Sequence, residues 1–156
     1  MEKEELMTLS AEMGKLPWGQ EEIRKILPHR APFLLIDEVL ELEPGIRACA
    51  VKHVSAEEYY FQGHFPGNPV LPGVLLIESL AQTGALAILS LPQNRGRTAY
   101  FAGIDKARFR RKILPGEDVI LKMSILRVKG PVGIGQAEAY VGEQLACSAQ
   151  LTFAIA

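Results

Sequence analysis

The chain has 156 residues, of which 48% are apolar and 22% are charged, and its formal net charge at pH 7 is -1. This length suits one domain with a single core. The nearly balanced charge argues against a polyanion-binding protein, so no nucleic-acid partner is expected.

The N-terminal segment, residues 1–19, is a charged and weakly patterned leader that is either a loose helix or flexible. One domain is expected over residues 20–156. The acidic start lacks the apolar segment of a secretory signal peptide. Cys49 and Cys147 are far apart and show no pairing motif, so both are expected to be buried free thiols. Free thiols favour a reducing compartment, and the expected location is the cytoplasm.

Patterns of apolar residues predict a short helix and a series of strands. Apolar residues at helical spacing predict the helix over residues 20–27, which Pro28 ends. Strands are predicted where branched or alternating apolar residues lie between turn signals, and the glycines and proline of 130–135 predict a connection. The predicted strands span residues 33–43, 46–54, 97–111, 118–128, 136–141 and 144–155.

The longest apolar segment, residues 74–91, is too long for a typical strand and predicts a helix. It is rich in alanine and follows Pro72 and Gly73, which suit the start of a helix. Glu78 and Gln82 interrupt it and no basic flank anchors it, so membrane insertion is not expected. One long helix among five or six antiparallel strands predicts an α+β fold, with a curved sheet around the central helix.

The stretch GHFPGNPVLPGVLLIESLAQ, residues 63–82, carries the features that indicate chemistry. Three prolines and three glycines surround His64 and stiffen the loop that leads into the long helix. Glu78 lies about one and a half turns into that helix, where burial would raise its pKa. Gln82, one turn later, is placed to hold the Glu78 carboxyl by a hydrogen bond. The alternative is that this helix face reaches solvent or a subunit contact.

The start of the long helix completes a candidate active site. Free N–H groups near Gly73 and Val74 form a partial positive pole, which would stabilise an oxygen that gains negative charge. A base, an acid and an oxyanion site suit proton abstraction beside a carbonyl, followed by loss of a leaving group. The other histidines, His29 and His53, are expected to have structural or surface roles. No cluster has the spacing of metal ligands.

The 63–82 stretch closely resembles the active-site segment of the 3-hydroxyacyl-acyl carrier protein dehydratases of bacterial type II fatty acid synthesis. HRAPFLLIDEV (29–39), FAGIDKARFRR (101–111) and the segment 127–155 are similar to the same family, so the resemblance covers residues 20–155. It implies a hot-dog fold, a dimer with shared active sites, and a hexamer built as a trimer of dimers. Glutamate at position 78 favours the broad-range dehydratase over the related dehydratase/isomerase.

The reaction that the resemblance implies is reversible dehydration of (3R)-hydroxyacyl-acyl carrier protein to the trans-2-enoyl form in fatty acid elongation. The protein itself would need no cofactor. His64 and Glu78 match the catalytic pair, with Glu78 contributed by the partner subunit, and Gly73 matches the glycine whose N–H binds the thioester oxygen. The expected supporting residues are Gln82, Phe65 and Pro66.

A basic run near the expected site predicts docking of the acidic carrier protein. Alternation along a strand places Lys106, Arg108 and Arg110 on one face, and Arg111 follows directly. The alternative is a solvated strand face.

Two positions depart from the family pattern: Ala31 stands where an aromatic residue is frequent, and Glu38 where arginine is frequent. The pocket shape and the chain-length preference therefore stay open. The alternative functions are a hot-dog acyl-thioester hydrolase, a dehydratase that also isomerises the enoyl double bond, and a non-catalytic acyl-chain binding module.

Overall fold

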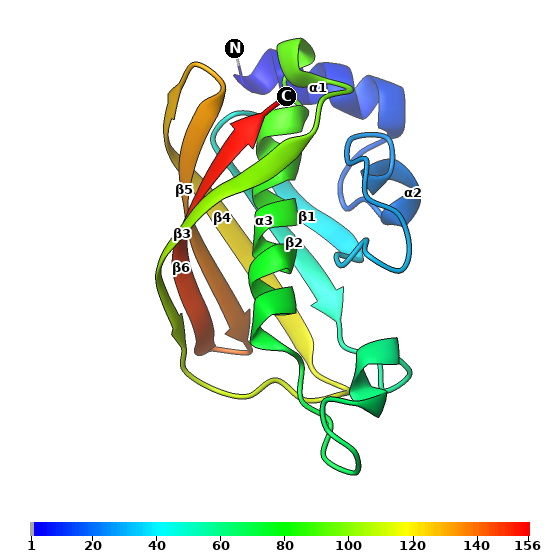
Figure 1. Cartoon of the computed structure of the whole chain (residues 1–156). Coiled ribbons are helices and arrows are strands. Elements are labelled where there is room, and N and C mark those ends of the chain that lie inside the picture. Colours follow the sequence, from blue (N-terminus) through cyan, green and yellow to red (C-terminus); the bar gives the residue numbers. More distant parts are fainter. Residues whose placement is uncertain (1) are drawn as a thin grey trace.

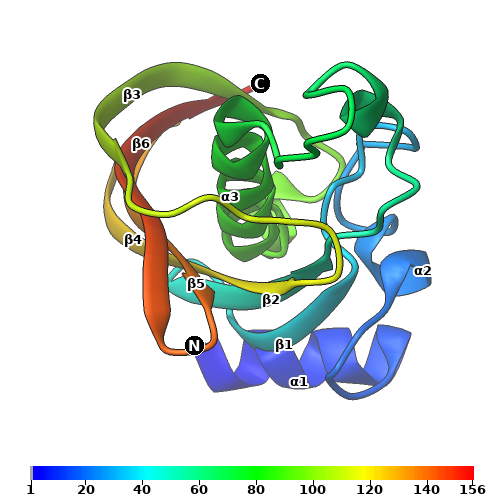
Figure 2. The same ribbon diagram turned by 90° about the horizontal axis from the view of Figure 1, so that it is seen from below.

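A computed structural model describes residues 2–156 and shows one curved sheet wrapped around a long helix (Figure 1). The strands are β1 (Glu38–Glu43), β2 (Arg47–His53), β3 (Ala99–Phe109), β4 (Asp118–Lys129), β5 (Val132–Val141) and β6 (Gln144–Ile155). The helices are α1 (Glu2–Met13), α2 (Gln20–Ile23) and α3 (Gly73–Leu89), with 3-10 turns η1 (Tyr59–Gln62) and η2 (Pro92–Asn94). Neighbouring strands are antiparallel, in the order β1-β2-β4-β5-β6-β3. Figure 2 looks along α3 and shows the sheet curving around it, which confirms the predicted α+β architecture with six strands.

The central helix α3 approaches the sheet very closely. Leu80 is completely buried. At Gly84, a Cβ atom would lie 2.8 Å from Met123 Cγ on β4, so glycine is what allows the helix backbone to come this near. The buried hydroxyls of Ser79 and Thr83 donate to carbonyls one turn earlier, at 2.8 and 2.9 Å, and so leave no unsatisfied donor. The helix is therefore a rigid base for the side chains that it projects.

The first five residues of the predicted strand 33–43 are not in a strand, and the side chain of Gln82 binds the backbone of two of them. Gln82 Oε1 accepts from Leu35 N at 2.9 Å, and Gln82 Nε2 donates to Phe33 O at 2.8 Å. The side-chain amide of Gln82 thus makes the hydrogen bonds that the backbone of a neighbouring strand would otherwise make. Strand β1 starts only at Glu38. The predicted helix 20–27 is also shorter than expected, since α2 contains its first four residues and turns follow.

Strand β5 starts earlier than predicted, so Gly133 and Gly135 lie within it rather than in a connection. Neighbouring side chains occupy the space above both glycines: the ring of Phe153 lies over Gly133, and the thioether of Met123 lies over Gly135. Both glycines therefore leave room within a strand for a neighbouring side chain. In the sequence alone they cannot be distinguished from the glycines of a turn.

The segment before Gln20 packs against the rest of the chain. Leu9 and Met13 of α1 belong to the main core, as does Trp18. Trp18 and Val39 exchange backbone hydrogen bonds of 3.0 and 2.9 Å, which attaches this segment to β1. Figure 1 shows α1 lying across the end of the molecule at which α3 ends.

Cys49 and Cys147 are buried free thiols, as predicted. Burial raises the pKa of Cys147 to about 11, which keeps the thiol protonated and unreactive at neutral pH. Within residues 2–156, no helix is long and apolar enough to span a bilayer.

Candidate active site

His64 lies in a short loop whose hydrogen bonds fix both its position and its tautomer. Val70 N donates to His64 O at 2.9 Å, and His64 Nδ1 lies 2.7 Å from Val70 O. A carbonyl oxygen only accepts, so Nδ1 carries the proton and Nε2 of the neutral ring has a free lone pair. Of the three expected supporting residues, two follow His64 directly: Phe65 stacks on the imidazole with ring centroids 4.1 Å apart, and Pro66 is exposed. The loop therefore presents His64 as a base through Nε2.

A partly buried ion pair anchors the segment that precedes His64. Lys52 of β2 has a side chain that is only 3% exposed, and its Nζ lies 3.3 Å from Glu58 Oε1. Glu58 directly precedes η1, and Phe61 of η1 is buried in the core. Lys52 was not among the predicted site residues, although a lysine within the apolar run of β2 is a signal that identifies it.

The start of α3 lies beside His64 in a hollow of about 430 Å³. Gly73 and Val74 are the first two residues of the helix, and Pro72 provides no side-chain cap, so their N–H groups have no partner within α3. A Cβ atom at Gly73 would lie 2.7 Å from Phe109 Cε1, so this position has no room for a larger residue. A base and a helix N-terminus are thus held in one hollow.

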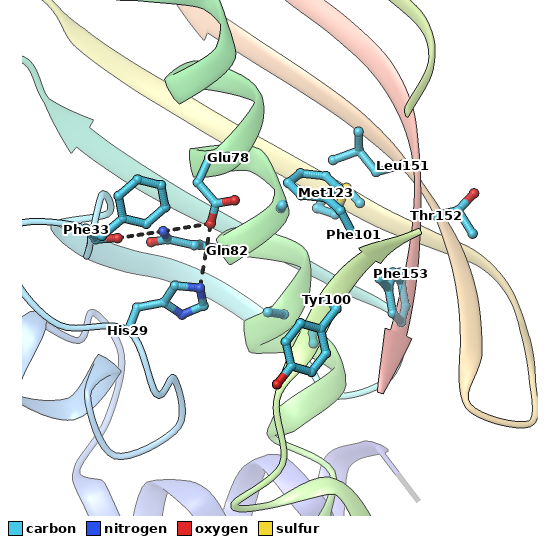
Figure 3. A pocket seen from close by; sticks show the side chains of 13 residues that line it. His29, Phe33, Glu78, Gln82, Tyr100, Phe101, Met123, Leu151, Thr152 and Phe153 are labelled. Atoms are coloured by element: carbon cyan, nitrogen blue, oxygen red, sulfur yellow. Dashed lines mark hydrogen bonds and ion pairs between the residues drawn. The ribbon is translucent and has the colours of Figure 1, made fainter. Parts of the chain in front are cut away.

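Glu78 lies in a second hollow of about 240 Å³, which is lined by α3, β3, β6 and the loop before β1 (Figure 3). Gln82 Nε2 donates to Glu78 Oε2 at 3.0 Å, and the bonds to Leu35 and Phe33 fix the orientation of the Gln82 amide. Burial raises the pKa of Glu78, and the hydrogen bond from Gln82 offsets part of this rise. Glu78 therefore keeps its proton to higher pH than an exposed glutamate does and is suited to act as an acid.

His29, for which a structural or surface role was predicted, also lines the hollow of Glu78. Its Nε2 lies 3.6 Å from Glu78 Oε2 (Figure 3). Burial, followed by the charge of Arg30, lowers the pKa of His29 and so favours the neutral ring at pH 7. No local pattern identifies this neighbour, because His29 reaches Glu78 only when the loop before β1 folds back onto α3.

Within one chain, His64 and Glu78 do not share a hollow. Among the described residues, the two hollows have no lining residue in common. The edge strand β3 links them, since Tyr100 and Phe101 near its start line the hollow of Glu78 and Phe109 at its end lines that of His64. A single chain therefore holds the two halves of the predicted pair at opposite ends of one edge strand.

Strand β3 exposes apolar side chains at the edge of the sheet. Tyr100, Phe101, Ile104 and Phe109 are between 43% and 58% exposed. In the described part of the chain, no strand pairs with the outer side of β3. An apolar and unpaired edge is a surface that can pair with another chain.

The basic run at the end of β3 contains a bulge that alternation does not predict. The register shifts just before Arg108, and Lys106 there has a positive φ of 53°. Strict alternation predicted that Lys106 shares a strand face with Arg108 and Arg110. The bulge interrupts this alternation, so the prediction is wrong at Lys106. Arg108 and Arg110 are exposed, whereas Arg111 is held by Glu117 at 2.8 Å. Arg110 and Arg111 line the hollow of His64.

The two departures from the family pattern, Ala31 and Glu38, line neither the hollow of His64 nor the hollow of Glu78. Glu38 Oε2 lies 2.7 Å from His53 Nε2, and Asp118 Oδ1 lies 2.6 Å from His53 Nδ1, so the imidazole ties β2 to both neighbouring strands. The bond to Asp118, followed by that to Glu38, raises the pKa of His53. Ala31 is exposed. Across residues 2–156, no group of three or more His, Cys, Asp or Glu side chains is arranged to hold a metal ion.

Comparisons with known proteins show the family of this chain. A family model described as a FabA-like domain matches residues 27–150. The 3-hydroxyacyl-[acyl-carrier-protein] dehydratase FabZ of Chloroflexus aggregans is 56% identical over 135 residues, which cover 86% of this chain and 94% of the relative. The protein of the same name from Staphylococcus aureus is 57% identical over 134 residues, which cover 86% of this chain and 92% of the relative.

A solved structure shares the fold at much lower identity. The dehydratase heterocomplex ApeI:P from Xenorhabdus doucetiae superposes with a TM-score of 0.73 at 18% identity, covering 90% of this chain and 91% of that chain. The hot-dog fold that the resemblance implied is thereby confirmed. On these matches the chain belongs to the FabA-like family and, within it, to the 3-hydroxyacyl-[acyl-carrier-protein] dehydratases of the FabZ type.

Proposed function

We propose that this chain catalyses the reversible dehydration of (3R)-hydroxyacyl-acyl carrier protein to trans-2-enoyl-acyl carrier protein in fatty acid elongation. The observation that carries the proposal is the geometry of the site: an imidazole beside the start of α3 and a buried carboxyl on the same helix. His64 Nδ1 bonds to Val70 O, which leaves Nε2 free to act as a base, and burial raises the pKa of Glu78. A free base and a protonated acid are what removal of a C2 proton and of a C3 hydroxyl requires.

The reaction follows from these positions. His64 Nε2 takes the proton from C2, and the electron pair of that bond moves toward the thioester carbonyl. The N–H groups at the start of α3 bind the carbonyl oxygen while it gains charge. Glu78 gives its proton to the C3 hydroxyl, and the C3–O bond breaks as the electron pair returns from the carbonyl to form the C2–C3 double bond, so that water leaves. Each positioned acid or base contributes about two to four orders of magnitude in rate.

The active site is completed by a second copy of the chain. If two β3 strands pair antiparallel along their exposed edges, the Tyr100 end of one lies beside the Phe109 end of the other. That pairing brings the Glu78 hollow of one chain toward the His64 hollow of its partner. It also covers the apolar edge that the single chain exposes. We extend the proposal to the hexamer, a trimer of such dimers.

The substrate arrives on acyl carrier protein, and no cofactor takes part. The exposed Arg108 and Arg110 lie next to the His64 hollow, where a basic surface would attract an acidic carrier. The buried free thiols fit a reducing compartment, so the proposed location is the cytoplasm.

The direct test is an enoyl absorbance assay with purified protein and 3-hydroxyacyl-acyl carrier protein. Dehydration should raise the absorbance, and the same protein should hydrate the enoyl product. Release of free thiol, detected with a thiol reagent, would instead indicate an acyl-thioester hydrolase. Separation of the products by double-bond position distinguishes a simple dehydratase from one that also isomerises. An unchanged absorbance with every substrate, from a folded protein, contradicts the proposal.

A further inference from the structure

The hollow that contains Glu78 continues along α3 as a stripe of small side chains. Ala81 and Ala85 line it at positions i+3 and i+7 from Glu78. Ile88, at i+10 on the same helix face, lies about 15 Å from Glu78 along the helix axis. It lines a further hollow of about 510 Å³ at the far end of α3. Two hollows therefore follow one face of the central helix.

One aromatic side chain of β6 separates these two hollows. Among the described lining residues, Phe153 alone is common to both. Figure 3 shows its ring at the sheet side of the Glu78 hollow, beyond Tyr100. On its other side, the far hollow has apolar lining from Ile88, Leu91, Val128 and Ile155, and polar lining from Gln93, Asn94 and Arg97. Without this ring, the two hollows would join into one passage from Glu78 to the end of α3.

A glycine on the neighbouring strand determines where the Phe153 ring lies. Phe153 pairs with Gly133 of β5. A Cβ atom at Gly133 would lie 2.6 Å from Cε2 and 2.9 Å from Cε1 of the ring, and closer still to Cζ. The ring therefore lies against β5 only because position 133 has no side chain, and a methyl group there would push it toward α3. Gly133 itself lines neither hollow.

We propose that Phe153 is the end wall of the acyl-chain site and sets the longest chain that is accepted efficiently. The inference rests on the proposed function, since it takes the acyl chain to run from Glu78 along the alanine stripe. A chain that ends before Phe153 buries its tail in the first hollow. A longer chain has to displace the ring or leave its last methylenes in water.

The test compares the wild-type protein with F153A, F153L and G133A. The quantity measured is kcat/KM for enoyl formation from carrier-bound substrates, from 3-hydroxybutyryl to 3-hydroxypalmitoyl. In F153A, the ratio of long-chain to short-chain kcat/KM should rise about fourfold for each methylene that newly enters the far hollow. F153L should give a smaller rise and preserves more packing if F153A folds poorly. G133A should shift the limit in the opposite direction, toward shorter chains.

The matched control is I155A, which changes the far hollow alone and should leave the length profile of the wild type in place. A length profile that is the same in wild type, F153L and G133A would overturn the end-wall role. Short substrates report on the proposed function separately. If the wild type dehydrates no substrate of any length, the proposed function fails rather than the role of Phe153.

Discussion

Replacement of Gln82 by methionine tests how the acid of the site is held. Gln82 is 1% exposed, and its amide makes three hydrogen bonds: to Leu35 N, to Phe33 O and to Glu78 Oε2. Methionine has a similar length and makes none of them. Since Leu35 is itself buried, its N–H loses its partner, which costs about 1–3 kcal/mol. With the two weaker losses, Q82M should destabilise the fold by about 2–4 kcal/mol, or about 5–15 °C in Tm.

The same substitution should move the pH profile of activity. In the wild type, activity should fall at alkaline pH when Glu78 loses its proton. The hydrogen bond from Gln82 lowers the pKa of Glu78, so its removal raises that pKa. The alkaline limb of the Q82M profile should therefore lie at higher pH than that of the wild type.

The assays are enoyl formation across the pH range and thermal unfolding at fixed protein concentration. T83V is the control, because Thr83 is buried next to Gln82 but donates only to Ser79 O, at 2.9 Å. T83V should lose about 1 kcal/mol or less and keep the alkaline limb in place. An alkaline limb that stays fixed or moves to lower pH in Q82M would refute the assigned role of Gln82.

Two further predictions concern the surface. Reversal of charge at Arg108 and Arg110 should raise KM for carrier-bound substrate and weaken the salt dependence of that KM. Short substrates on a small thiol should react nearly as before. Equal losses of activity with carrier-bound and small-thiol substrates would mean a damaged site. H53Q should destabilise the fold most at acid pH. Because the folded-state pKa of His53 is raised, its contribution is fully present below the unfolded pKa of 6.5 and is lost as pH rises through the folded value. The side chain is 50% exposed, so the effect should stay below about 1 kcal/mol, and a larger effect at alkaline pH in urea unfolding would contradict it.

The central helix and most of the strands were predictable because their patterns are local. The segment 74–91 is apolar beyond the length of a strand, and β6 alternates regularly. The start of β1 was not predictable, because the backbone of Phe33 and Leu35 bonds to Gln82, which is 47 positions away from Leu35 in the chain. Gly133 was misread as a turn residue for a similar reason, since the ring that it accommodates belongs to another strand.

The site was predictable as a set of residue types but not as an arrangement. His64 and Glu78 stand out because one lies in a rigid loop and the other interrupts an apolar helix. The presence of His29 beside Glu78 depends on how a loop packs on α3, and the bulge at Lys106 depends on pairing between β3 and β6. Neither leaves a periodic pattern in its own segment.

The central claim is that His64 of one chain works with Glu78 of another, and mixed dimers test it most directly. Homodimers of H64A and of E78Q each contain two incomplete sites. In a mixed dimer, one site combines the intact His64 of the E78Q chain with the intact Glu78 of the H64A chain. Random pairing of equal amounts makes about half of the dimers mixed, each with one complete site of two, because a twofold interface places each pair reciprocally.

The measurement is the rate of enoyl formation after the two inactive variants are unfolded, mixed and refolded, with exchange of chains verified by mass. Each single substitution should cost about a hundredfold or more, so recovered activity is visible above the background of the homodimers. A site shared between two chains predicts recovery to about a quarter of the wild-type rate. If verified mixed dimers stay inactive, His64 and Glu78 act within one chain and the shared site is wrong.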